Sequence, residues 1–220
     1  MPQSPSFIQF FISTFVNLLI SPKKTMKSLA FTKVTRAFYY YITLCGIVFI
    51  CDSLILMVRM STSSPLSEVN PMVGYSSPFL PLFIVIVPQV LALGILIRTT
   101  NFFGGTKGFV ETTKSVLYGF TPAFFSMFCW RVILNAGILP NTLDFFSPVG
   151  IIVSNASFFI FTVVWSGYLI TLGLSEFHEI PMRKAFHSVF SCFILVLVIF
   201  AVVNAAIFLI SQPYVPASFP

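Results

Sequence analysis

The sequence predicts an all-α membrane protein, a polytopic bundle of five transmembrane helices with N-terminal interfacial amphipathic helices. Of its 220 residues, 57% are hydrophobic and only 8% are charged, which leaves too little polar surface to cover a soluble globule. A second observation is a series of five apolar runs, each near the roughly 20 residues that a helix needs to cross a bilayer. A third is the uneven distribution of Lys and Arg between the connecting segments. The chain therefore has no room for a separate soluble enzyme domain.

Residues 1–36 are predicted to form an interfacial amphipathic and polybasic segment. The run from Phe7 to Ile20 is apolar but too short to span a bilayer. Its polar residues Gln9, Ser13 and Asn17 recur at every fourth position. This spacing predicts a helix with a narrow polar stripe that lies in the membrane interface.

A second short helix is predicted to begin at Ser21-Pro22, because serine is a common N-cap and proline is favoured in the first helical turn. We expect this helix to carry a set of basic residues that contacts anionic lipid of the cytoplasmic leaflet. The set is Lys23, Lys24, Lys27, Lys33 and Arg36.

Residues 37–220 form the predicted five-span domain. The spans are expected at about 37–58, 79–97, 115–139, 149–172 and 188–210. Gly173 is expected to end the fourth helix, since glycine commonly follows a helix C-terminus. The pair Gly104-Gly105 is expected to form a tight turn at the membrane face.

The orientation follows from the basic residues, which favour cytoplasmic loops. Five Lys and Arg precede the first span, three lie between the second and third, and two lie between the fourth and fifth, against Arg59 alone in the external loops. The N-terminus is therefore expected in the cytoplasm and the C-terminus outside or in a lumen. Membrane topology also explains the formal net charge of +6 without a nucleic acid partner. In the last cytoplasmic loop, Glu176, His178 and Glu179 are expected to form an exposed, solvated cluster.

Asp52 and Arg131 lie inside predicted spans, where an ionisable group is costly and rarely faces lipid. Each is on the order of 10–14 Å from the outer end of its span at ~1.5 Å per residue. The matching depths predict an ion pair that joins the first and third spans. A structural clasp is the favoured role, and a gate or proton relay is the alternative. Arg131 has a further option, which is to extend outward beside Trp130 at the interface.

The residue patterns point to no catalytic, cofactor-binding or metal-binding site. No serine lies in a GxSxG motif, and the glycine-rich segment from Gly104 to Gly108 lacks the GxxxxGK[ST] pattern of phosphate-binding loops. The cysteines form no CxxC pair and lie within apolar runs. They are Cys45, Cys51, Cys129 and Cys192. Cys51 and Cys129 lie at similar predicted depth, which leaves a disulfide as an alternative to free thiols.

Four segments in order along nearly the whole chain resemble those of a known family. They are Leu19-Ile20-Ser21-Pro22-Lys23; Phe103-Gly104-Gly105 with Phe109 and Thr113; Tyr118-Gly119-Phe120-Thr121-Pro122; and Trp165 to Leu172-Gly173-Leu174, leading to Lys184-Ala185. The sequence resembles the Yip-domain family, five-span membrane proteins that interact with Ypt/Rab GTPases, and it is most similar to the compact prokaryotic or archaeal members. The family-like motif residues are Gly104, Gly105, Tyr118, Gly119 and Pro122.

The resemblance implies a five-span fold and, for eukaryotic members, vesicle traffic between the endoplasmic reticulum and the Golgi. It implies the cell membrane as the location in a prokaryote and the endoplasmic reticulum or Golgi in a eukaryote. The expectation that the chain binds a small GTPase rests only on this family analogy.

Two functions of different classes follow. The first is a non-enzymatic membrane scaffold or adaptor that contacts membrane lipids and either other membrane proteins or further copies of itself. The alternative is a small transporter, channel or lipid scramblase, with Asp52, Arg131 and helix breaks at Pro88 and Pro122 along a polar path.

Substitution of Asp52 by Asn tests the predicted ion pair. Because the change leaves the Arg131 guanidinium without a charged partner inside the membrane, we expect a sharp fall in the yield of folded protein in detergent. An unchanged yield and melting temperature would count against the pair.

Overall fold

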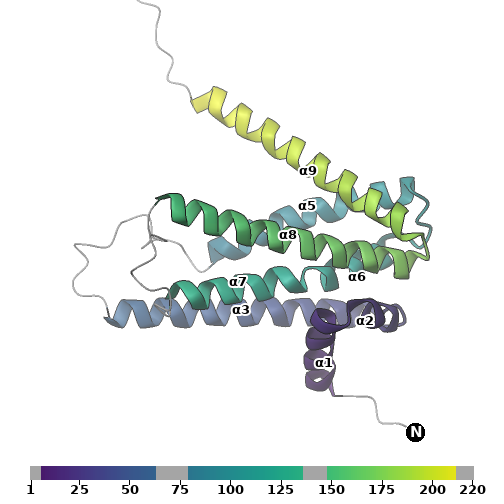
Figure 1. Cartoon of the computed structure of the whole chain (residues 1–220), viewed down its shortest axis with the longest axis horizontal. Coiled ribbons are helices and arrows are strands. Elements are labelled where there is room, and N and C mark those ends of the chain that lie inside the picture. Colours follow the sequence, from purple (N-terminus) through teal and green to yellow (C-terminus); the bar gives the residue numbers. More distant parts are fainter. Residues whose placement is uncertain (1–5, 63–78, 136–147, 212–220) are drawn as a thin grey trace, which may run out of the picture.

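The structure is a computed structural model that describes residues 6–62, 79–135 and 148–211. All regular secondary structure in these ranges is α-helical (Figure 1), which confirms the predicted all-α class for this part of the chain. The helices, in chain order, are α1 (Phe7–Ile20), α2 (Pro22–Leu29), α3 (Val34–Thr62), α5 (Phe79–Phe102), α6 (Gly108–Gly119), α7 (Thr121–Asn135), α8 (Pro148–His178) and α9 (Met182–Ser211).

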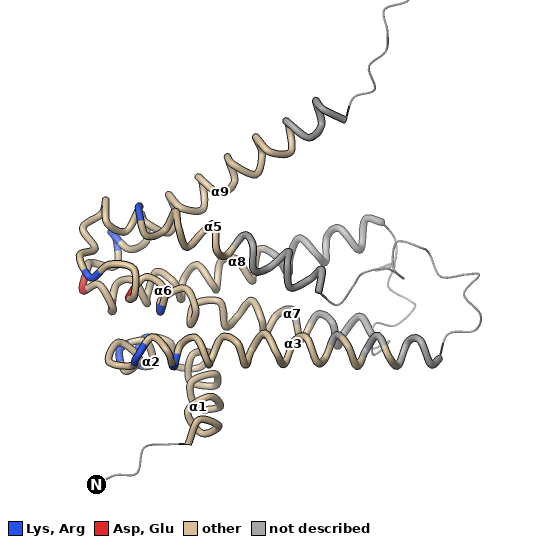
Figure 2. Tube along the Cα trace, turned by 180° about the vertical axis from the view of Figure 1, so that it is seen from behind, with Lys and Arg blue, Asp and Glu red and all other residues tan. Residues whose placement is uncertain are grey.

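The long helices α3, α5, α7 and α8 lie alongside one another, and the short helix α6 continues the line of α7 (Figure 1). Helix α1 lies across this bundle. Helix α9 starts beside α5 and α8 and then slants away from them. The Lys, Arg, Asp and Glu residues of the described part gather at one end of the bundle, which we call the charged end (Figure 2).

Three described helices contain segments long and apolar enough to cross a membrane. These segments are Val34–Cys51, Ile160–His178 and Met182–Ala205. They support the prediction of an integral membrane protein, and five spans remain a prediction.

Helix α1 has the bounds that the sequence predicts. Its start is fixed by a capping box, in which the Ser6 hydroxyl accepts a hydrogen bond from the Gln9 backbone and the Gln9 side chain accepts one from the Ser6 backbone. Helix α2 begins at Pro22, as predicted. It ends at Leu29, however, so Lys33 lies in the following turn and Arg36 belongs to α3.

The third predicted span, 115–139, is not a single helix. Helix α6 begins earlier, at Gly108, and ends at Gly119, and α7 begins at Thr121. The cause of the break is Pro122, which has no backbone N–H to donate to the Tyr118 carbonyl one turn earlier. The Thr121 hydroxyl donates to that carbonyl instead, at 2.6 Å.

Gly173 does not end the fourth helix, because α8 continues to His178. Its role is close packing. A Cβ atom at Gly173 would lie 3.1 Å from the Ser115 Cα, and one at Gly119 would lie 2.3 Å from a side-chain carbon of Ile170. The contact pairs run in opposite directions along the sequence, so α8 is antiparallel to α6 and approaches it through small residues.

Helices α1 and α2, which belong to the predicted interfacial segment, contribute side chains to the main core. Leu18 of α1 and Met26 of α2 are completely buried in one cluster with Tyr40, Tyr118 and Leu169. Helices α1 and α2 are therefore fixed to the bundle by apolar side chains.

Substitution of Gly119 by Ala tests the close approach of α6 and α8. The added methyl group meets Ile170, including its backbone nitrogen at 3.0 Å, so we expect a loss of about 1–3 kcal/mol in the free energy of unfolding. Thermal unfolding in detergent measures the effect.

Gly167→Ala is the matched control on α8. A Cβ atom there meets nothing within 4 Å, and alanine favours helix over glycine by up to about 1 kcal/mol. The control protein should be as stable as the wild type or more so. An equal loss in both variants would contradict the packing argument.

Candidate functional site

The charged end of the bundle contains a buried lysine. Lys114 of α6 is only 2% exposed, and its ammonium group donates hydrogen bonds to the backbone carbonyls of Ala30 at 2.8 Å and Thr32 at 3.2 Å. It also lies 2.7 Å from a carboxylate oxygen of Glu111, in an ion pair whose angles are not those of a hydrogen bond. The Phe177 ring of α8 lies below it, with its centroid 5.2 Å away.

These contacts satisfy two needs at once. An ammonium group loses several kcal/mol of hydration on burial unless charges and acceptors replace the water. The last carbonyls of a helix have no partner within the helix, and those of Ala30 and Thr32 follow the end of α2. Lys114 thus ties the turn between α2 and α3 to α6 and α8. The sequence analysis placed this residue in the loop between the second and third spans and missed its burial. The one available signal was Glu111, three residues earlier.

Tyr118 lies next to this contact and is completely buried. Its hydroxyl is 3.5 Å from the Thr32 hydroxyl, and its ring packs on that of Tyr40 with centroids 5.4 Å apart. The Tyr40 hydroxyl in turn lies 3.1 Å from that of Thr121. The aromatic pair therefore connects α3 to the break between α6 and α7, which gives the motif residues Tyr118 and Pro122 a structural role.

His178 is not part of a solvated cluster, as the sequence analysis expected, because it is only 3% exposed. Its Nε2 atom lies 2.9 Å from the Thr112 hydroxyl. That hydroxyl donates to the Gly108 carbonyl, so we assign the imidazole proton to Nε2. The other nitrogen, Nδ1, is buried, has no hydrogen-bond partner within the described residues, and faces Gly105. His178 lies one turn after Leu174, on the same helical face. This spacing was the sign of burial that the sequence offered and that was missed.

The Gly104-Gly105 turn is present as predicted, and its two glycines serve different purposes. Gly104 has a φ of +98°, which glycine adopts more readily than other residues. A Cβ at Gly105 would lie 2.5 Å from a Thr100 methyl group and 3.0 Å from His178 Nδ1. The first glycine permits the turn, and the second lets it pack on α8.

Two further polar contacts join helices at the charged end. The Ser188 hydroxyl of α9 lies 2.9 Å from that of Thr100 on α5. On the surface, Lys107 forms an ion pair with Glu179, which follows α8 with a φ of +57°. The contact links the end of α8 to the start of α6, and exposed pairs of this kind contribute about 0–1 kcal/mol.

The predicted lipid-contact residues all have exposed side chains near the charged end. Arg36 also lies over the Phe10 ring of α1, 5.5 Å from its centroid. The full set is Lys23, Lys24, Lys27, Lys33 and Arg36. Contact with lipid stays a prediction.

The side chains of Asp52 and Arg131 lie outside the described residues, so the ion pair also stays a prediction. Asp52 belongs to α3 and Arg131 to α7 by their positions in the chain, and these two helices pack against each other.

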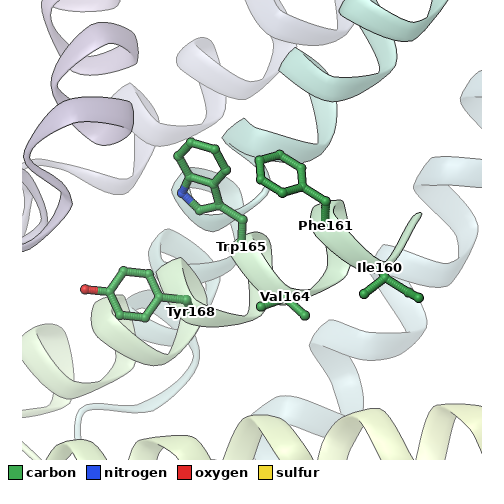
Figure 3. A pocket seen from close by; sticks show the side chains of 5 residues that line it. All are labelled: Ile160, Phe161, Val164, Trp165 and Tyr168. Atoms are coloured by element: carbon green, nitrogen blue, oxygen red, sulfur yellow. The ribbon is translucent and has the colours of Figure 1, made fainter. Parts of the chain in front are cut away.

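A shallow recess lies on the outer face of α8 (Figure 3). One helix supplies its whole lining, which is apolar apart from a tyrosine hydroxyl and an indole nitrogen. The lining residues are Ile160, Phe161, Val164, Trp165 and Tyr168. Such a surface suits lipid tails, since it lacks the convergent polar groups of a binding pocket for a polar ligand.

Comparison with known proteins identifies one family. The family model described as the Yip1 domain matches residues 16–203. No curated protein and no solved structure matches the chain significantly. The match covers the helices of the charged end, including every family-like motif residue, and confirms the resemblance seen in the sequence.

Substitution of Lys114 by Met tests the role of the buried ammonium. Methionine fills most of the space but leaves two carbonyls and Glu111 without their partner, so we expect a loss of about 2–4 kcal/mol in the free energy of unfolding. We also expect trypsin to cut the turn between α2 and α3 faster, because its carbonyls are released. Lys107→Met, at the exposed pair, is the matched control and should change both readouts little. Equal behaviour of the two variants would contradict the assigned role.

Proposed function

The chain belongs to the Yip1 domain family, and we propose that it is a non-enzymatic membrane scaffold or adaptor with five spans and its charged end in the cytoplasmic leaflet. The observation that carries the proposal is the use of the buried polar groups at the charged end. The Lys114 ammonium binds carbonyls of the α2–α3 turn, His178 Nε2 pairs with Thr112 of α6, and Thr100 pairs with Ser188 of α9. Groups arranged for catalysis or transport would instead converge on a space for a substrate.

Helix α1 supports an interfacial role, because it has three distinct faces. The face toward the bundle includes the buried residues Thr14 and Leu18. One of the two exposed faces is apolar and the other is polar. Ile8, Ile12, Val16 and Ile20 form the first, and Gln9, Ser13 and Asn17 form the second. A helix that packs on a bundle at the bilayer surface needs one face for protein, one for lipid tails and one for headgroups. In this position α1 occupies space in one leaflet only.

Helix α9 supports contact with lipid or another membrane protein. It slants away from the bundle (Figure 1), and its exposed residues from Phe190 to Val203 are almost all apolar. The side-chain amide of Asn204, which follows this range, donates a hydrogen bond to the Phe200 carbonyl of the same helix. A helix that is apolar on all sides belongs in hydrocarbon.

A specific observation favours the second candidate, a transporter or lipid scramblase. The buried hydroxyls of Ser126 on α7 and Ser166 on α8 have no hydrogen-bond partner within the described residues. They lie in helices that meet near the break at Phe120, and broken helices mark substrate paths in many transporters. Helix α5, in contrast, stays one helix through Pro88.

Two measurements decide between the candidates. The tagged protein is purified from native membranes in mild detergent, next to an unrelated five-span control, and co-purifying proteins are identified by mass spectrometry. We expect a protein partner at fixed stoichiometry that binds again when both purified components are mixed in nanodiscs.

In parallel, proteoliposomes are assayed for solute flux and lipid scrambling. The scaffold proposal expects rates equal to those of protein-free vesicles. Activity that is lost in the Ser126→Ala/Ser166→Ala double variant, together with no partner, would replace the scaffold by the transport function.

A further inference from the structure

Phe31, in the turn between α2 and α3, is the most exposed large hydrophobic side chain in the described part of the chain. It is 90% exposed, whereas its neighbour Leu29 is almost completely buried. An apolar ring in water is unfavourable, so such a residue at the charged end calls for a partner surface.

The exposure of Phe31 is enforced by its neighbours. The carbonyls of Ala30 and Thr32, on either side of it, both point inward and accept hydrogen bonds from Lys114. The Leu29 carbonyl accepts from the backbone and the hydroxyl of Thr32. With both flanking peptides held against the core, the Phe31 side chain is directed outward from a rigid turn.

The surroundings of Phe31 carry one sign of charge. Lys27, Lys33 and Arg36 are exposed within five residues of it, and Lys23 and Lys24 precede them on α2. Residues 21–36 contain no Asp or Glu. The nearby Glu111 carboxylate is already paired with Lys114. The turn therefore presents an aromatic ring within an unneutralised basic surface.

We propose that the α2–α3 turn is an anchor for anionic lipid, in which Phe31 enters the boundary between headgroups and acyl chains while the basic side chains bind lipid phosphates. The inference rests on the proposed function for the position of the charged end at the cytoplasmic leaflet. Charge complementarity selects the partner, since this leaflet is anionic and attracts basic segments next to a membrane. The chain also exposes an apolar residue on the other side of α2, since Ile20, the last residue of α1, is 74% exposed.

Tryptophan fluorescence tests the position of residue 31. The Phe31→Trp variant of the full chain is placed in nanodiscs of phosphatidylcholine with 30% phosphatidylserine, and the spectrum of the wild type is subtracted. We expect blue-shifted emission from the introduced indole, quenched by brominated acyl chains and protected from aqueous acrylamide. Quenching by acrylamide alone would place residue 31 in water. It would overturn the lipid anchor.

Lipid retention tests the specificity. The protein is purified from liposomes of equal phosphatidylcholine and phosphatidylserine, and the retained lipids are measured by mass spectrometry. We expect Phe31→Ser and the Lys27→Ala/Lys33→Ala/Arg36→Ala triple variant each to lower the ratio of anionic to zwitterionic lipid at least twofold.

Phe102→Ser is the matched control, since Phe102 is 84% exposed at the end of α5, outside the basic segment of residues 21–36. It should leave the ratio unchanged. An equal drop in all variants, or in none, would overturn the proposal. Melting temperatures verify that each variant folds. We expect folded variants, because the substituted side chains are exposed. The partner and flux assays can reject the scaffold proposal without changing the fluorescence result at residue 31. Failure of the proposed function and failure of the lipid anchor are therefore distinguishable.

Discussion

The burial of one ammonium group organises the charged end of this protein. Lys114 has left water almost completely, so its three hydrogen atoms must find acceptors within the fold. Two carbonyls after α2 accept hydrogen bonds from it, Glu111 of its own helix balances its charge in an ion pair, and the Phe177 ring of α8 covers it. An apolar contact of the same area would tolerate sliding, whereas these directed contacts allow one position of the turn. The position of the α2–α3 turn and the outward direction of Phe31 both depend on this arrangement.

Close approach of backbones is the second constraint. In a membrane the apolar side chains gain little from leaving lipid for protein, so helices associate through tight packing and polar contacts. Gly119 and Gly173 let Ile170 and Ser115 of the opposite helix pack directly on their backbones, and Gly105 brings the α5–α6 turn onto the end of α8. Gly105 and Gly119 are also family-like motif residues, and both lie within the range that the Yip1 domain model matches.

Patterns local to one helix were predictable, and contacts between helices were not. The bounds of α1 followed from its polar stripe, and the Gly104-Gly105 turn followed from glycine chemistry. Lys114 and His178 were placed in water because charge and polarity are the default signs of exposure, and a sequence does not show that Ala30, Thr32 or Thr112 lies opposite them. Gly173 was assigned as a helix end because the sequence does not show which residue lies opposite it either. Glycine stops helices and also permits close packing, and only the position of Ser115 separates these roles.

Helix length explains why a polar core is tolerated at one end. Helix α8 has 31 residues and is therefore about 46 Å long, against a hydrocarbon thickness of about 30 Å. In the proposed orientation, with the charged end at the cytoplasmic leaflet, this excess length lets the end of α8 reach the headgroup region, where water can hydrate polar groups before they pack. His178 lies in the last turn of α8, and Thr112 and Lys114 lie on α6, which packs against it. The midsections of α8 and α9 expose apolar side chains instead. The rigidity of the charged end thus comes from hydrogen bonds and the membrane residence from apolar surface, and the two requirements fall on different parts of the same helices.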